Sequence, residues 1–312
     1  MSLPEYPHFT LVEAAPGVYG AMAGDTGACV SNAAIIDLGD RTLIFDTFQT
    51  IQAAEDLREA AMALTGRSAA LSVISHWHSD HTGGAQVFDD APIMATARTC
   101  ELIAGEDPGD LDAYTAEIDG ALDALRTMRD NATSELERAS AESNLKVVEL
   151  LKEGAPGFRF TVPAPMDGEG MTFEGSDRRV EIVSYGVGHT ESDLFAHVPD
   201  TDLVVLGDLL WVGRHPRVND GDALAWAAVL DRIDGLGAAS LIPGHGDIGG
   251  RADGEYLAGY LRTIADLVDD ALTSGLDAAA LGTIPVPAGS EGWDSTALFY
   301  GSLTSLTGAG QG

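Results

Sequence analysis

The sequence carries very little positive charge. Lys146 and Lys152 are its only lysines, and 17 lysines and arginines in all face 49 aspartates and glutamates, for a formal net charge of −32. Nucleic-acid binding rests largely on lysine and arginine that neutralise phosphates, so this composition argues against a nucleic-acid partner. We interpret the acidity as a property of the solvated surface, which identifies no partner by itself.

Cysteine and long apolar runs are also scarce. Cys29 and Cys100 form neither a CxxC pair nor a disulfide framework, and we expect each to be a small buried hydrophobic residue. No apolar run approaches the roughly 18 residues that a membrane span needs, so we expect no membrane segment. The first residues lack the basic start and apolar stretch of a secretion signal, and the expected location is the cytoplasm.

The chain is long for one hydrophobic core but has no obvious linker. Hydrophobic residues make up 45% of its 312 residues, and no Pro-, Ser- or Gly-rich segment separates two halves. We therefore predict a single domain over residues 1–312 that contains an insertion. Residues 277–312 form a C-terminal extension whose structure the pattern does not predict.

The first third of the chain alternates short strands with a helix. Apolar runs at 18–23, 30–37 and 42–46, separated by turns, predict a β-meander. Apolar residues at three- and four-residue steps then predict a helix over 51–64 that ends at Gly66. A short buried strand at 71–75 leads directly into a histidine-rich loop, and another strand is predicted at 93–96.

Residues 111–152 have a different, helical texture. Apolar residues recur with helical spacing, and neither proline nor glycine occurs from 121 to 153. We predict an inserted helical hairpin, either a helix pair packed on the surface or a lid or homodimer face over the site.

Strands resume after the hairpin. The pattern predicts strands at 180–187, 194–198, 203–206 and 240–243, and helices at 223–233 and 255–272. Mixed strands with helices segregated around them predict an α+β fold, with two packed sheets flanked by helices on both outer faces.

Three of the eight histidines fall within six residues. His76, His78 and His81 lie with Asp80 on the loop that leaves the strand at 71–75. Imidazole nitrogens and carboxylate oxygens are ligands that zinc prefers, so one loop with four of them predicts a metal site for up to two ions. The glycines that follow at 83 and 84 predict a tight turn that lets the backbone pass close to the metals.

Three later positions repeat one theme. His189, Asp208 and His245 each stand beside glycine where an apolar strand ends. Side chains recruited from several strand ends can converge on one point of a rigid scaffold, so we take these three residues as further candidate ligands.

The pattern HxHxDH followed by these three residues resembles the metallo-beta-lactamase superfamily, over about residues 18–249. The resemblance implies a four-layer αβ/βα sandwich and a site for two metal ions, zinc first, with manganese or iron as alternatives. It further implies a first ion on His76, His78 and His189, a second ion on Asp80, His81 and His245, and a bridging Asp208. Asp46 matches the family's aspartate that supports the histidine loop by hydrogen bonding.

The implied activity is hydrolysis of a small molecule. Two zinc ions that share a water lower its pKa from about 15.7 toward roughly 7, and Asp80 would pass a proton to the leaving group. Asp208 stands where many β-lactamases of the superfamily have Cys or Ser, which favours an ester, thioester or lactone substrate over a β-lactam. A β-lactam hydrolase and a mononuclear iron persulfide dioxygenase are the alternative functions.

Few residues point to substrate contacts. Trp211 stands three residues beyond Asp208, where β-lactamases often have lysine and homoserine lactonases tyrosine, and it would form an apolar wall with one donor. Arg214, with His215 and Arg217, either recognises an anionic group or is simply solvated, and the solvated reading is favoured. His8 and His197 are not expected to be ligands.

Overall fold

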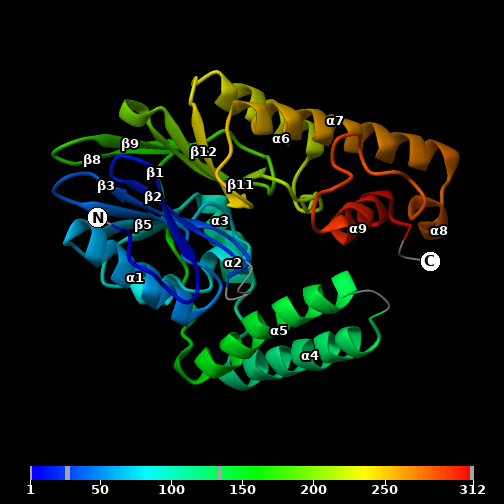
Figure 1. Cartoon of the computed structure of the whole chain (residues 1–312), viewed down its shortest axis with the longest axis horizontal. Helices are drawn as coiled ribbons and strands as arrows, with labels where there is room; N and C mark the ends of the chain where they lie inside the picture. The colour runs from blue at the N-terminus through cyan, green and yellow to red at the C-terminus, as the bar shows by residue number, and fades with distance from the viewer. Residues whose placement is uncertain (1, 25–28, 133–134, 310–312) are drawn as a thin grey trace. The chain divides into compact units, whose positions relative to one another are not determined.

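The computed structural model describes residues 2–24, 29–132 and 135–309. The chain forms two compact units (Figure 1). The first unit comprises residues 1–166 with 173–179, and the second comprises residues 167–172 with 180–312. The single domain with an insertion therefore stays a prediction.

A seven-stranded mixed sheet forms the centre of the first unit. Strands β1 to β4 are neighbours in an antiparallel arrangement, and β4 to β7 continue the sheet in parallel. The predicted meander is confirmed as β2 to β4, whereas β1 and β7 were not predicted. The strands are β1 (Thr10–Ala15), β2 (Val18–Met22), β3 (Ala33–Asp37), β4 (Thr42–Phe45), β5 (Ala69–Val73), β6 (Ile93–Ala95) and β7 (Ala164–Pro165).

Helix α1 covers one face of this sheet. It spans Ile51–Thr65 and ends at Gly66 as predicted, and the Thr50 hydroxyl caps its start by accepting from the Ala53 amide. Leu57 on its inner face belongs to the same buried core as Ile44 of β4. The remaining short elements of this unit are α2 (Ser79–Thr82), η1 (Ala85–Phe88), α3 (Ala97–Gly105) and η2 (Ala155–Gly157).

The predicted helical hairpin is present as α4 (Leu111–Asp130) and α5 (Glu135–Gly154). The two helices lie side by side in Figure 1, and Ile118, Leu122 and Leu145 form a small buried core between them. A hydrogen bond of 3.1 Å from Gln52 Nε2 to the Leu150 carbonyl ties the hairpin to α1. Its role as a lid or dimer face stays a prediction.

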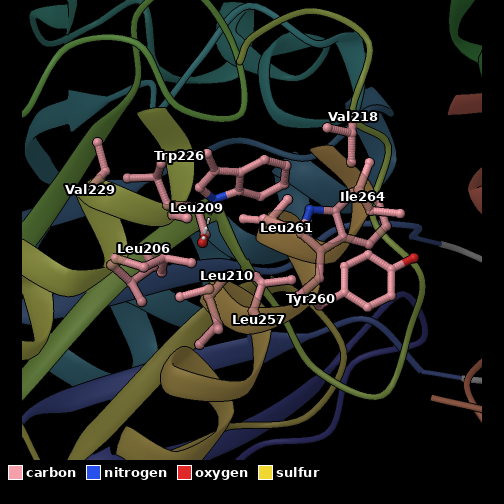
Figure 2. Close-up of a cluster of buried hydrophobic side chains, with 14 of the residues drawn as sticks. Leu206, Leu209, Leu210, Val218, Trp226, Val229, Leu257, Tyr260, Leu261 and Ile264 are labelled. Carbon is pink, nitrogen blue, oxygen red and sulfur yellow. Dashed lines mark hydrogen bonds between the residues drawn. The ribbon is translucent and has the colours of Figure 1, made fainter. Parts of the chain in front are cut away.

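A five-stranded mixed sheet forms the centre of the second unit, in the order β12-β11-β10-β9-β8. Helices α6 and α7 pack on it, and Figure 2 shows Trp226 of α6 and Leu257 and Leu261 of α7 against Leu206 and Leu210 of β11. The elements are β8 (Gly170–Glu174), β9 (Arg179–Ser184), β10 (Leu194–Val198), η3 (Pro199–Thr201), β11 (Leu203–Trp211), α6 (Ala223–Asp234), β12 (Ser240–His245) and α7 (Arg251–Ser274). The predicted α+β fold with two mixed sheets flanked by helices is confirmed.

Strands β11 and β12 run further than their sequence patterns suggested, and β12 continues to His245 rather than ending at residue 243. Strand β11 continues to Trp211 rather than ending at residue 206, so Asp208 lies inside a strand and not after one. The pairing of β11 with β12 shifts register on both sides of Gly207, which has a φ of 51°. Glycine tolerates this left-handed backbone, so the strand continues where the sequence looked like a turn.

The structure bears on the two cysteines and on the membrane-spanning character of the helices. Cys29 and Cys100 are free and buried, as expected, and burial raises the pKa of both thiols. Among the helices of the described residues, none combines the length and the apolar character that crossing a membrane requires.

The C-terminal segment is part of the second unit's core. Helices α8 (Ala278–Leu281) and α9 (Thr296–Thr307) were not predicted, and Phe299 and Leu303 of α9 are fully buried. The same segment holds the loop after β11, because the His215 amide donates to the Asp294 carbonyl at 2.9 Å. His215 itself is buried, with Nδ1 2.9 Å from the Tyr260 hydroxyl, so the solvated reading of this residue is wrong.

Burial of His215 makes the stability of the protein depend on pH. Desolvation lowers the pKa of His215 below its ordinary 6.5, so the folded state resists protonation more than the unfolded state does. The stabilisation is complete above the unfolded pKa and is lost as pH falls below it toward the lowered folded pKa. We expect His215→Leu to remove up to about 1.4 kcal/mol per pH unit of this slope. Urea unfolding of both proteins from pH 7.5 to 5 measures the difference, and parallel curves would contradict it.

Candidate functional site

The first-unit cluster consists of His76, His78, Asp80 and His81. The chain leaves β5 at Val73 and reaches His76 after two buried residues, and α2 then carries Asp80 and His81. The His76 Nε2 and His78 Nδ1 atoms face each other at 3.0 Å. The His81 Nε2 atom lies 3.5 Å from the Asp80 carboxylate, so the donor atoms of the cluster meet in two close pairs.

Asp46 supports this cluster from beneath. Its carboxylate accepts from the Ser75 amide at 2.7 Å, from the Ser75 hydroxyl at 2.8 Å and from His81 Nδ1 at 2.8 Å. Because the Ser75 proton is directed at Asp46, the Ser75 oxygen is free to accept from His76 Nδ1, 2.8 Å away. Both histidines are then protonated on Nδ1, which leaves each Nε2 lone pair available to a metal.

Burial dominates the electrostatics of Asp46. The carboxyl group is fully buried, and desolvation raises its pKa, while the electrostatic interaction with His81 and the hydrogen bonds from His81 and Ser75 act in the opposite direction. A buried carboxylate that accepts three hydrogen bonds is a rigid anchor. Ser75 was not singled out from the sequence, although its position immediately before His76 was the available signal.

The backbone after Asp46 also holds the cluster. Asp46 and Phe48 both have a φ of 61°, a left-handed conformation that is strained for a bulky residue such as phenylalanine. In this conformation the Thr47 amide and hydroxyl both donate to the His81 carbonyl, at 2.9 and 3.0 Å. The segment from Asp46 to Phe48 is therefore hydrogen-bonded directly to α2.

Gly83 and Gly84 lie in a turn, as expected, and each also leaves room for a neighbouring backbone segment. Their backbone is not left-handed, with φ of −61° and −88°. A Cβ at Gly83 would lie 2.2 Å from the Gln49 carbonyl oxygen, and one at Gly84 would lie 2.2 Å from that of Thr47. The glycines are needed so that segment 47–50 can pass against α2.

The second-unit cluster consists of His189, Asp208 and His245. His189 lies on the loop between β9 and β10, Asp208 within β11, and His245 at the end of β12. The loop is held by Asp193, whose carboxylate accepts from the Thr190 amide at 3.0 Å and from the Thr190 hydroxyl at 2.9 Å. Asp193 was missed from the sequence because an aspartate at a strand start carries no distinctive signal.

Asp208 faces both histidines of its unit at once. Its Oδ2 atom lies 3.2 Å from His189 Nε2, and its Oδ1 atom lies 3.3 Å from His245 Nε2. All three side chains are less than a tenth exposed. Each oxygen of the carboxylate thus lies beside one imidazole nitrogen, and nitrogen and carboxylate oxygen are both atoms that can bind a metal.

The donor atoms fit a metal ion in their spacing. Two ligands of a tetrahedral zinc ion bound at about 2.0–2.1 Å lie about 3.3 Å apart. The separations of 3.0 Å in the His76 and His78 pair, 3.2 Å in the His189 and Asp208 pair and 3.3 Å in the Asp208 and His245 pair are all close to that value. Buried imidazoles and carboxylates in such pairs form a candidate metal site.

Gly244 keeps space open for Asp208. A Cβ built on Gly244 would lie 2.0 Å from Asp208 Oδ1 and 2.7 Å from the Asp208 amide nitrogen. No side chain other than hydrogen can occupy this position while the carboxylate stays where it is. Gly244 of β12 therefore has to be glycine because the Asp208 side chain of the adjacent strand β11 occupies the space of a Cβ.

The two proposed substrate contacts lie at the end of β11. Trp211 is the last residue of the strand and is almost fully buried, with its ring stacked on His245. Arg214 is partly exposed, and its backbone bridges to Asp294. Their roles in substrate binding stay predictions. His8 and His197 lie beside Asp56 and Glu181 on the part of the chain that the structure describes, apart from both clusters in sequence and contacts.

The sequence comparison identifies the family. The family model for the metallo-beta-lactamase superfamily matches residues 26–245, a span that contains every residue of both clusters. The chain therefore belongs to the metallo-beta-lactamase superfamily. Among curated proteins no sequence match is found.

Solved structures agree in fold. A metallo-beta-lactamase from Pontibacter korlensis is 15% identical with a TM-score of 0.57, over 81% of this chain and 99% of that one. The metallo-beta-lactamase DIM-1 is 19% identical with a TM-score of 0.56, over 83% and 99%. TMB-1 is 16% identical with a TM-score of 0.57, over 83% and 100%. At these identities the likeness shows the fold alone.

The support from Asp46 can be tested by removing only its charge. Asp46→Asn keeps the size of the side chain but replaces a carboxylate that accepts three hydrogen bonds. Loss of such a partner of a metal-binding histidine weakens metal affinity by about 10–100-fold. Competition with a chromophoric chelator measures the affinity, and circular dichroism checks the fold. An unchanged affinity in a folded variant would show that Asp46 does not orient His81.

The steric role of Gly244 can be tested with a matched pair of variants. Gly244→Ala should displace the Asp208 carboxylate and reduce bound metal, because the new methyl group would lie 2.0 Å from Oδ1. Gly259→Ala is the control, since a Cβ at that position of α7 meets nothing within 4 Å. Elemental analysis of the purified proteins measures the metal content. Equal metal content in both variants would contradict the prediction.

Proposed function

We propose that this protein is a metal-dependent hydrolase in which the two clusters together hold two divalent ions, zinc in the first place. The ligand assignment follows the family pattern. His76, His78 and His189 hold the first ion, Asp80, His81 and His245 hold the second, and Asp208 bridges them.

The paired geometry of Asp208 is the observation that carries this proposal. A buried carboxylate needs compensating positive charge, and one that faces two separate imidazoles with two separate oxygens matches two cations better than one. A second observation supports the proposal. Ser75 and Asp46 hold the Nδ1 protons of His76 and His81, so the Nε2 atom of each histidine keeps a lone pair that can bind a metal.

Two bound divalent ions would lower the pKa of a shared water to about 7 and polarise the substrate carbonyl. The protein contributes the proton transfer and the shape of the site. Asp80 would take up the proton that the shared water releases and pass it to the leaving group, and its side chain is accessible for this role, being 18% exposed while that of His81 is 0% exposed. Its main chain is fixed by the Ser31 hydroxyl, which donates to the Asp80 carbonyl at 2.5 Å.

We propose an ester, thioester or lactone as the substrate. An aspartate at position 208, in place of the Cys or Ser of many β-lactamases, supports this class over β-lactams. Trp211 would supply an apolar wall, and Arg214 would meet an anionic group of the substrate. Arg214 is partly exposed, so its side chain is accessible to such a group.

Metal analysis together with a substrate panel tests the proposal. We expect about two zinc or manganese ions per chain and turnover of a lactone, thioester or aryl ester. The panel also contains a phosphodiester and a chromogenic β-lactam. One iron per chain with oxygen consumption on glutathione persulfide would instead identify a persulfide dioxygenase, and turnover of the β-lactam alone would replace the proposed substrate class.

The bridging role of Asp208 generates a further prediction. Asp208→Ala should lose metal and hydrolytic activity together while the fold survives, because both ions lose a ligand. Asp266→Ala is the control, since this aspartate is exposed on α7 of the same unit. Metal content, kcat/KM and circular dichroism are measured on both. Full turnover in the Asp208→Ala variant would contradict the proposal that Asp208 bridges the two ions.

A further inference from the structure

Trp211 makes an unusually close ring contact with a proposed metal ligand. Its ring centroid lies 3.9 Å from that of His245, with only 26° between the two planes. This is a face-to-face arrangement in which the indole covers one side of the imidazole. Trp211 is 6% exposed, so solvent does not compete for the contact.

The main chain fixes this stack. Trp211 and His245 are register partners at the ends of the parallel strands β11 and β12. The Val212 amide then donates to the His245 carbonyl at 3.0 Å, which holds the two strand ends together. Gly246 follows with a φ of 90°, and a Cβ there would lie 2.0 Å from the Val212 carbonyl oxygen. The two rings are therefore brought together by backbone pairing and not by chance rotamers.

The other tryptophan of this region behaves differently. Trp226 meets His189 edge-on, with centroids 4.9 Å apart and 66° between the planes, and its Nε1 donates to the Leu209 carbonyl at 2.9 Å. The buried Nε1 of Trp211 has no hydrogen-bond partner among the described residues. Trp226 is thus anchored to its own sheet, whereas the Trp211 ring stacks on His245 and lies further from the tilted ring of His189, with centroids 6.2 Å apart.

We propose that Trp211 is a positioning residue for His245, and that its stacked indole sets the affinity of the second metal ion. The stack limits rotation of the imidazole and keeps Nε2 directed toward Asp208, 3.3 Å away. An imidazole that gives electron density to a cation becomes electron-poor, and an indole face stabilises such a ring. This inference rests on the proposed function, because it requires His245 to bind a metal.

Three variants test the proposal. Trp211→Leu keeps apolar volume but removes the aromatic face, and Trp211→Phe keeps a smaller face. Trp293→Phe is the matched control, because Trp293 packs on Tyr260 in the same unit, away from the proposed ligands. Each metal-free protein is titrated with zinc in competition with a chelator, so that the two binding steps are resolved. Cobalt absorption spectra report the geometry of the loaded sites, and circular dichroism checks the fold.

We expect Trp211→Leu to bind the second ion about 10–100-fold more weakly, with the first ion unchanged. Trp211→Phe should fall between Trp211→Leu and wild type, and it carries the test if the leucine variant does not fold. Equal second-ion affinity in all proteins, or an equal loss at both ions, would overturn the positioning role. Wild-type protein that binds fewer than two ions would overturn the proposed function itself, which is a different outcome from a wild type with two ions and an unaffected Trp211 variant.

Discussion

The buried carboxylate of Asp208 is the group on which the rest of the second unit's cluster depends. A charge placed among apolar strands is costly unless it is matched, and here two imidazoles lie at 3.2 and 3.3 Å on its two oxygens. Two glycines of the neighbouring strands make this placement of the Asp208 carboxylate possible. The register shift at Gly207 directs Asp208 inward from a strand that continues to Trp211, and Gly244 leaves the space that the carboxylate occupies.

The two units hold their histidines by different physical means. In the first unit, hydrogen bonds from buried polar groups set the protonation and direction of His76 and His81. In the second unit, aromatic faces and edges pack against His189 and His245. Hydrogen bonds fix the tautomer of an imidazole, whereas ring packing fixes its plane, so the two kinds of contact constrain different features of these side chains.

Much of the fold and of the candidate site was predictable from the sequence. The HxHxDH pattern and the glycine-flanked residues identified both clusters because metal ligands need particular side chains at particular strand ends. What could not be predicted depends on three-dimensional neighbours. Asp193 and Ser75 look ordinary in sequence, and the strand through Asp208 was cut short because glycine at 207 resembled a turn. Helix α9 has too little amphipathic pattern to be recognised, since its buried side chains depend on a pocket formed by distant residues.

The burial of α9 and α7 has a consequence for how this protein relates to its family. The shared family region ends at residue 245, yet Leu257, Leu261, Phe299 and Leu303 from beyond that point fill the core under β11. A fragment trimmed to the shared region would leave the apolar side of that sheet open to water and prone to aggregate. The core of the second unit therefore needs helices that lie beyond the family-matched span, and a chain that ended at His245 would lack the side chains that complete this core.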